Sequence, residues 1–334
     1  MSTRGTSTRW GILGPGRIAE KVAADFGNVT NGTLVAVGSR SGERARAFAE
    51  TYAGQVPIRA HQGYDALLAD PDVDAVYIAT PHSDHARQAI AAIEAGKAVL
   101  LEKSFTATLD GARAVVEAAR QREAFVMEAM WTRFQPVVLR AKRLVADGAI
   151  GEVRAVQADL GVRRPLDPAD RMFALELGGG TLLDLGVYVV SFAQHFLGAP
   201  DSVQVTGSLV PETGVDAEAG LLLGYDDGRS ATLQTSFRLP LPGQARIYGT
   251  HGWIDIPPRF HHPIDLVLHR HGEEPLQEHL PPSGAGYAEE FIEVGRCLAA
   301  GLTESDVMPL ADTLAVQAVL QQAADRLGVA LHER

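Results

Sequence analysis

The chain has 334 residues, enough for two domains that each bury a core of their own. Hydrophobic residues make up 46% of it and charged residues 21%, which is the profile of a water-soluble globular protein. The formal net charge of -11 excludes a general attraction to nucleic acid or to an anionic membrane, so a phosphorylated ligand needs a local site.

The N-terminal residues and the cysteine content bear on the cellular compartment. Residues 1–9, MSTRGTSTR, lack the apolar core of a signal peptide, and no run approaches the 18 apolar residues of a membrane span. The one cysteine, Cys297, cannot form an intramolecular disulfide and is expected to pack as a small apolar residue in a helix. We therefore expect a cytoplasmic protein with a disordered leader.

Strand-like and helix-like segments alternate through the first part of the chain. Apolar runs predict strands, and amphipathic segments that end at glycine or proline predict the helices between them. This alternation predicts a parallel, doubly wound sheet, with only a connection around residues 58–64. The expected strands cover residues 9–13, 33–39, 73–80, 98–101 and 124–127, and the expected helices cover 17–24, 41–53, 65–70, 82–97 and 108–123.

The pattern changes near Glu128, where alternating strands joined by turns such as Asp226-Asp227-Gly228 replace the earlier order. We expect a domain of residues 1–127 that binds a dinucleotide, and an α+β domain of residues 128–334 for substrate binding and dimerisation. Its open, mostly antiparallel sheet needs a cover, which a partner subunit would provide. The expected strands lie within 153–161, 201–209, 219–237 and 246–256, and the expected helices cover 136–148, 181–197, 288–300 and 310–327.

A glycine-rich turn joins the first expected strand to the first expected helix. Gly14 permits a tight bend, Gly16 lets the backbone approach a pyrophosphate, and Ala19 takes the third place of the G-x-G-x-x-G/A pattern. The helix N-terminus adds unpaired N–H groups and a positive dipole end, so Arg17 and Ile18 are expected at the same site. An ordinary glycine-rich turn is the alternative, and the strand that follows one helix length later argues against it.

The end of the second expected strand indicates the choice of cofactor. An acidic residue there would bind the ribose 2′-OH of NAD, whereas Ser39 and Arg40 can hydrogen-bond and neutralise a 2′-phosphate. The sequence therefore predicts NADP, with NAD possible as a second cofactor. The alternative is that Arg40 is a surface residue opening a helix.

Polar residues follow two further strand ends, at the edge where such sheets bind ligands. Thr80, Pro81, His82 and His85 follow one of them and are expected to line the cofactor cleft, although either histidine would serve equally well as a helix cap or a surface residue.

Glu102 and Lys103 close the next strand. A lysine beside a redox site can bind a substrate hydroxyl, hold the nicotinamide ribose and lower the pKa of a neighbouring proton acceptor. A solvated turn is the alternative, and the position at the strand's carboxyl end favours function.

The segment LGGGTLLDLGVY, residues 177–188, opens a helix with three glycines. Asp184 and Tyr188 fall four residues apart on one face of that helix, where a carboxylate and a phenol beside a cleft suit proton transfer. The alternative is a tight glycine turn with Tyr188 packed in the core.

These motifs together resemble the glucose-fructose oxidoreductase, inositol dehydrogenase and rhizopine catabolism (Gfo/Idh/MocA) family. GILGPGRIA, TPHSDH, LLEKSF, MEAMWTRF and LGGGTLLDLGVY occur in the family's order over nearly the whole chain. MEAMWTRF and DLGVY are most similar to the branch of dihydrodiol dehydrogenases and NADP-dependent D-xylose dehydrogenases. The resemblance implies a Rossmann domain followed by a large antiparallel sheet, with dimers formed through the sheet.

The resemblance also implies roles for particular residues. Lys103 matches the family's Glu-Lys-Pro lysine, and Tyr188 the catalytic proton donor or acceptor. Asp184 matches the aspartate of the same segment, and Trp131 and Arg171 join it in the substrate pocket. No metal is expected.

Two residues depart from the family's pattern. Ser104 replaces the usual proline, which leaves the backbone after Lys103 less constrained. His261 stands where close relatives often have tryptophan, which argues against an aromatic diol substrate.

The sequence thus predicts an NADP-preferring oxidoreductase acting on a secondary alcohol or hemiacetal of a sugar, polyol or diol. Tyr188 would exchange the hydroxyl proton while Lys103 favours its phenolate. The alternatives are a reductase of an imine or enol-type substrate on the same scaffold and a regulator that senses NADP without turnover. The presence of both Lys103 and Tyr188 argues against the regulator, which needs only the dinucleotide-binding half.

Overall fold

The computed structural model describes residues 7–54 and 56–334, so residues 1–6 of the expected leader lie outside the described residues. The first strand begins at Thr8, and the Arg9 guanidinium pairs with Asp72 and Asp74, each at 2.8 Å. The leader prediction is therefore wrong for Thr8 and Arg9, because strand pairing and these ion pairs hold them in place.

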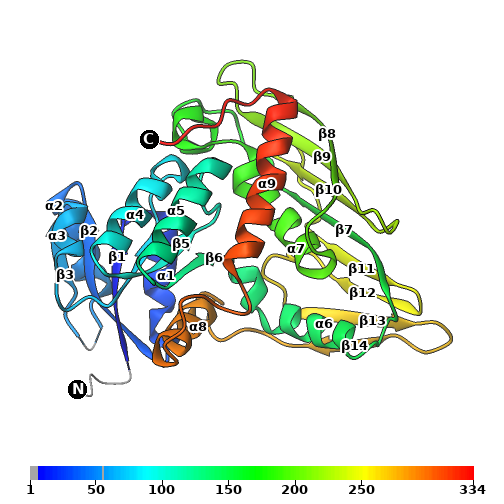
Figure 1. Ribbon diagram of the computed structural model, residues 1–334, viewed down its shortest axis with the longest axis horizontal. Helices are drawn as coiled ribbons and strands as arrows, with labels where there is room; N and C mark the ends of the chain where they lie inside the picture. The colour runs from blue at the N-terminus through cyan, green and yellow to red at the C-terminus, as the bar shows by residue number, and fades with distance from the viewer. Residues whose placement is uncertain (1–6, 55) are drawn as a thin grey trace.

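A six-stranded parallel sheet fills the N-terminal part of the chain, drawn in blue to green in Figure 1. Its order, β3-β2-β1-β4-β5-β6, reverses between β1 and β4, which confirms the doubly wound architecture. The strands are β1 Thr8–Leu13, β2 Gly32–Ser39, β3 Arg59–Gln62, β4 Ala75–Ile78, β5 Ala98–Glu102 and β6 Val126–Ala129, and the helices are α1 Arg17–Asp25, α2 Gly42–Tyr52, α3 Tyr64–Leu68, α4 His85–Glu94 and α5 Leu109–Gln121.

An eight-stranded sheet follows, in the order β14-β13-β12-β11-β7-β10-β9-β8. All neighbouring strands in it are antiparallel except β7 and β10, which pair in parallel, so the mostly antiparallel second sheet is confirmed. Its strands are β7 Val153–Gly161, β8 Ser202–Leu209, β9 Asp216–Gly224, β10 Ser230–Ser236, β11 Ala245–Gly249, β12 Gly252–Ile256, β13 Asp265–Arg270 and β14 Leu276–His279, and the helices of this part are α6 Pro136–Ala146, α7 Val187–Leu197, α8 Ala288–Ala299 and α9 Leu310–Leu327.

Three strands were not expected from the sequence: β3, β13 and β14. β3 reads Arg-Ala-His-Gln and β14 reads Leu-Gln-Glu-His, and both lie at sheet edges with most side chains exposed or half-buried. An edge strand of four residues with little buried surface has no hydrophobic alternation to reveal it. β13 does alternate, so its buried Leu266 and Leu268 were a usable signal for a strand.

The long helix expected at residues 181–197 has two parts. Leu182–Gly186 form a π-helical stretch, and α7 continues from Val187. Among the described residues, the stretch Leu175–Leu197 is long and apolar enough to span a membrane, but 83% of its most apolar window is buried inside the fold. It is therefore the core helix that covers the second sheet, where α7 contacts β7 and β10.

The end of the chain returns to the first sheet. Phe291 of α8 packs edge-on against Trp10 of β1, with ring centroids 4.7 Å apart, and lies 5.3 Å from Tyr77 of β4. Figure 1 shows α9 running between the two sheets, where it contacts both α5 and α7. The two parts of the chain are therefore joined by shared packing of α8 and α9.

The helices that contact the second sheet lie on one side of it in Figure 1, and its other face is open. The open face is polar for a surface that would be covered by a partner, because the outward positions of the alternating strands carry mostly polar and aromatic side chains. They include Gln157, Thr232, Gln234, Arg246, Tyr248, Trp253, Asp255 and His269.

Candidate active site

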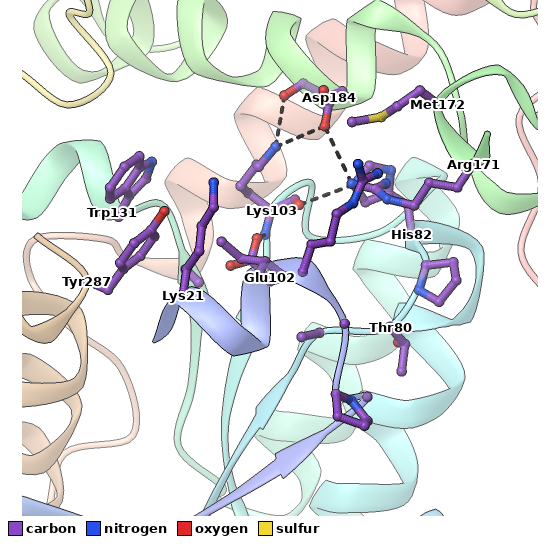
Figure 2. A pocket seen from close by; sticks show the side chains of 18 of the residues that line it. Lys21, Thr80, His82, Glu102, Lys103, Trp131, Arg171, Met172, Asp184 and Tyr287 are labelled. Carbon is purple, nitrogen blue, oxygen red and sulfur yellow. Dashed lines mark hydrogen bonds and ion pairs between the residues drawn. The ribbon is translucent and has the colours of Figure 1, made fainter. Parts of the chain in front are cut away.

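One cavity of about 1030 Å³ runs between the two domains. It begins at the carboxyl edge of the first sheet and reaches the π-helical stretch Leu182–Gly186, which packs on the second sheet, as the side chains in Figure 2 show. Nearly all of the residues expected at the site line it: Gly14, Gly16, Arg17, Ile18, Ser39, Arg40, Thr80, Pro81, His82, Glu102, Lys103, Trp131, Arg171, Asp184 and Tyr188.

The glycine turn fits a dinucleotide. Gly14 has a positive φ of 89°, and a side chain there would meet the Ala79 carbonyl oxygen at 3.0 Å. Gly16 caps the nine-residue helix α1, and no atom lies within 4 Å of the position where its Cβ would stand. The backbone at the start of α1 therefore leaves room for a ligand to approach closely, as pyrophosphate binding requires.

Two arginines stand at the ribose end of the cavity. Arg40 is exposed and makes no ion pair with any described residue, and Ser39 accepts a hydrogen bond from the Ser41 N–H at 3.2 Å. Arg44, four residues after Arg40, also lines the cavity and donates to the Pro15 carbonyl at 3.0 Å. Arg44 was not expected at the site, because Arg40 lies before the start of α2 and helical spacing does not relate the two residues.

The two histidines of the TPHSDH motif have different positions. His82 lines the cavity, with Nδ1 2.8 Å from the Gly178 carbonyl oxygen and Nε2 3.2 Å from that of Lys103. His85 lies behind the wall, where its nitrogens face the carbonyls of Thr80 and Ser104 at 2.8 and 2.9 Å. His85 is therefore a brace between two strand ends, and the prediction that it lines the cofactor cleft is wrong.

Lys103 and Asp184 meet across the domain boundary. The Lys103 ammonium donates to the Asp184 backbone carbonyl at 2.8 Å and to its carboxylate at 3.4 Å. Arg164 and Arg171 lie 3.7 and 3.9 Å from the same carboxylate. Burial alone would raise the pKa of Asp184, but these cations, Lys103 first, hold it below its ordinary value. Asp184 therefore stays ionised at neutral pH.

Tyr188 is held by a stack of three rings. Trp131 lies between His262 and Tyr287, nearly parallel to both, with ring centroids 4.8 and 4.5 Å away. With both ring faces covered, its indole N–H donates to the Tyr188 hydroxyl oxygen at 3.1 Å. Trp131 thus borders the cavity by its edge and orients the phenol.

The structure corrects the expected relation between Lys103 and Tyr188. The ammonium lies 4.7 Å from the centre of the phenol ring and makes no hydrogen bond to its oxygen. Burial raises the pKa of Tyr188 well above its ordinary value, and the nearby Glu102 and Asp184 act in the same direction. The phenol is therefore protonated at neutral pH, whereas the sequence led us to expect a stabilised phenolate.

Ser104 does not loosen the backbone after Lys103, as its difference from proline had led us to expect. The residue is fully buried, and its hydroxyl donates to the Leu183 carbonyl at 2.9 Å. The next residue, Phe105, donates its N–H to the Glu128 carboxyl at 3.1 Å. Side chains and sheet contacts thus supply the constraint that a proline ring would give.

Several residues of the cavity had no signal in the sequence. Arg164, Arg259 and Tyr287 come from irregular segments, and Lys21 and Glu290 sit on helices whose facing surfaces depend on how the domains meet. Burial raises the pKa of Glu290 well above its ordinary value, and neither of its carboxyl oxygens has a hydrogen-bond partner among the described residues.

A dinucleotide-binding sheet, a second sheet that covers the cleft, and a lysine with a tyrosine at its inner end define an oxidoreductase with a nicotinamide cofactor. Residues 8–130 match the oxidoreductase family with an NAD-binding Rossmann fold, and residues 138–255 match the GFO/IDH/MocA C-terminal domain. The chain belongs to the GFO/IDH/MocA family, which confirms the resemblance found in the sequence.

Curated relatives and solved structures agree with this assignment. The chain is 34% identical to a trans-1,2-dihydrobenzene-1,2-diol dehydrogenase from Xenopus laevis over 97% of this chain and 99% of that protein. It is 33% identical to the Homo sapiens enzyme of the same name, over 96% and 97%. An aldose-aldose oxidoreductase from Caulobacter crescentus superimposes with a TM-score of 0.87 at 25% identity, over 96% and 98%. A 3-ketoreductase from Actinomadura kijaniata, in complex with NADP and TDP-benzene, gives 0.83 at 25%, over 96% and 97%.

Proposed function

We propose that the protein is an NADP-preferring dehydrogenase or reductase that acts on a secondary alcohol or hemiacetal of a sugar, polyol or diol. The observation that carries this is the placement of Tyr188, Lys103 and Asp184 at the inner end of a cavity whose outer end fits a dinucleotide. By name, the relatives given above are diol dehydrogenases, an aldose-aldose oxidoreductase and a 3-ketoreductase, which supports the same reaction class. A cytoplasmic location is part of the proposal.

The bound cofactor supplies the hydride chemistry. Because Tyr188 is protonated at neutral pH and Trp131 already occupies one lone pair of its oxygen, the phenolic proton is free to be donated to a substrate oxygen. Lys103, tied to Asp184, places a positive charge where negative charge develops on that oxygen. Tyr188, Lys103 and Asp184 thus act as proton donor, electrostatic stabiliser and orienting carboxylate.

The direct test is turnover of a panel of aldoses, inositols and diols, followed by the absorbance of the reduced nicotinamide. The proposal requires reduction or oxidation of at least one member at a rate that saturates with its concentration. Tight NADPH binding without turnover of any member would favour the sensing regulator.

Replacement of Arg40 by alanine tests the cofactor preference. We expect NADP binding to weaken by roughly 1.5 to 3 kcal/mol, the worth of a hydrogen bond to a charged group, with NAD binding nearly unchanged. Titration of both cofactors against wild type and variant measures this. Arg46→Ala, an exposed position of α2 outside the cavity, is the control. Equal losses for NADP and NAD would contradict the assignment.

We also propose that the protein is a homodimer or a higher homo-oligomer, assembled through the open face of the second sheet. Sedimentation at micromolar concentration should then show a species larger than the 35.6 kDa monomer. Leu222, 44% exposed on β9, lies on this face, and Leu222→Glu should shift the equilibrium towards monomer. Leu302→Glu, at a 40% exposed site after α8, should not. A monomer in wild type would contradict the proposal.

A further inference from the structure

The cavity is far more cationic than the chain that forms it. Eight lysine and arginine side chains line it against three acidic ones, in a protein whose formal net charge is -11. Of the three acids, Glu102 and Glu290 have pKa values that burial raises, so Asp184 is the one held ionised. The excess positive charge therefore needs an anionic partner.

A dinucleotide accounts for only part of this charge. Arg17 follows the glycine turn, and Arg40 and Arg44 stand at the ribose end, so these three face the phosphates of the cofactor site. The remaining arginines come from the second domain, beside the catalytic groups. Among them, Arg164 has a buried Nε without a hydrogen-bond partner among the described residues, and Arg259 makes no ion pair with a described residue.

Arg164 follows β7, and its contacts hold it in place but leave part of its hydrogen-bonding capacity unused. Its backbone N–H donates to the Phe237 carbonyl at 2.8 Å, and its guanidinium lies 5.4 Å from the Phe237 ring centre. One terminal nitrogen is 3.7 Å from the Asp184 carboxylate, too far for a hydrogen bond. The buried Nε has no hydrogen-bond partner among the described residues, so a donor beside the site remains unpaired.

Arg259 lies in the loop after β12, with a positive φ of 75° that is uncommon for any residue but glycine. It lines the cavity, and its closest polar contact is the His262 Nδ1 atom at 3.5 Å. It makes no ion pair with a described residue. A strained backbone that presents a guanidinium without an ion pair to a cavity is typical of a binding site.

The two arginines belong to the same wall. The Gly243 N–H donates to Asp159 of β7 at 2.7 Å, and the Phe260 N–H donates to the Gly243 carbonyl at 2.8 Å. These bonds tie the loop that carries Arg259 to the strand that leads to Arg164. Leu160, near the end of the same strand, and Val162, just after it, also line the cavity.

We propose that Arg164 and Arg259 form a subsite for an anionic substituent of the substrate, a carboxylate or a phosphate on a sugar. The preferred substrate is then a sugar acid or a sugar phosphate, and a neutral sugar or diol reacts less well. Guanidinium groups bind both anions through paired, charge-assisted hydrogen bonds. This inference rests on the proposed function for the reaction, and only the subsite is new.

The test compares D-glucose with D-glucuronate and D-glucose 6-phosphate, by calorimetric titration of the NADP-loaded protein and by turnover. We expect at least one of the two anions to bind tenfold or more tightly than glucose, and which one does so separates a carboxylate from a phosphate site. Arg259→Gln and Arg164→Gln should each lower the ratio of anion to glucose affinity about tenfold or more. Arg163→Gln, an exposed neighbour outside the cavity, should leave that ratio unchanged.

Three outcomes would overturn the subsite: equal binding of the three sugars, an anion preference that survives in both variants, or a loss of NADP affinity in them that assigns these arginines to the cofactor. The proposed function has a separate outcome. Arginine-dependent anion binding without turnover of any sugar or diol would support the subsite and contradict the oxidoreductase. Turnover of neutral sugars without an anion preference would do the reverse.

Discussion

Tyr188→Phe is expected to lower kcat by roughly 10²- to 10⁴-fold, the usual contribution of general acid–base catalysis, with little change in NADP affinity. The substitution removes the hydroxyl that accepts from Trp131 and keeps the ring that packs against Lys103. Steady-state kinetics on any substrate found in the panel measures the effect, and a separate NADP titration shows that the cofactor site is intact.

Lys103→Met should cost a similar factor, and the double variant little more than either single one, because groups that act on one transition state are not additive. Near wild-type turnover of Tyr188→Phe would mean that the proton moves through another group. Asp184, or a water held by Lys103, would then be the next candidate. Fully additive losses would instead separate the roles of the lysine and the tyrosine.

The dinucleotide half of the site was predictable from sequence because its chemistry depends on backbone geometry. Gly14 has the positive φ that favours glycine, Gly16 leaves open space beside the turn, and the strand ends at Ser39, Thr80 and Lys103 all meet at one edge of a parallel sheet. Once the strand order is known, these residues are placed together at the carboxyl edge of the sheet. His85 is the exception, because its side chain points to the backbone carbonyls of Thr80 and Ser104 and not into the cavity.

The substrate half was predictable only in part. The helical spacing placed Asp184 and Tyr188 together, but neither spacing nor composition shows that Trp131 orients the phenol by its edge, or that Lys103 reaches the ring and not its oxygen. Arg164 and Arg259 come from irregular segments that no periodicity describes. Their positions follow from how a loop and a strand end pack together, which is tertiary information.

Glu128 is a second titratable group of interest, since it lies at the junction of the two domains. It is fully buried at the end of the first sheet and accepts hydrogen bonds from the Phe105 N–H and the Thr313 hydroxyl, both at 3.1 Å. Burial raises the pKa of Glu128 to about 7 in spite of these donors. It therefore holds the segment after Lys103 with a carboxyl group that titrates near neutral pH.

Glu128→Gln is expected to change how stability depends on pH. The folded-state pKa of about 7 lies above the ordinary 4.5, so the stability linked to this carboxyl is fully present below pH 4.5 and is lost as the pH rises towards 7. Glutamine does not titrate and keeps an oxygen for Phe105. The unfolding free energy of the variant relative to wild type should therefore rise by about 3 kcal/mol between these pH values.

Urea unfolding of both proteins at several pH values measures this difference, and contributions from other groups, such as Asp216 with its pKa of about 7, cancel because both proteins contain them. Glu94→Gln, at an exposed position at the end of α4, serves as the control and should show no such trend. A variant whose stability relative to wild type stays constant across this range would mean that folding does not raise the pKa of Glu128. The segment after Lys103 would then be anchored by a buried charge near neutral pH, which the Arg133 cation helps to balance.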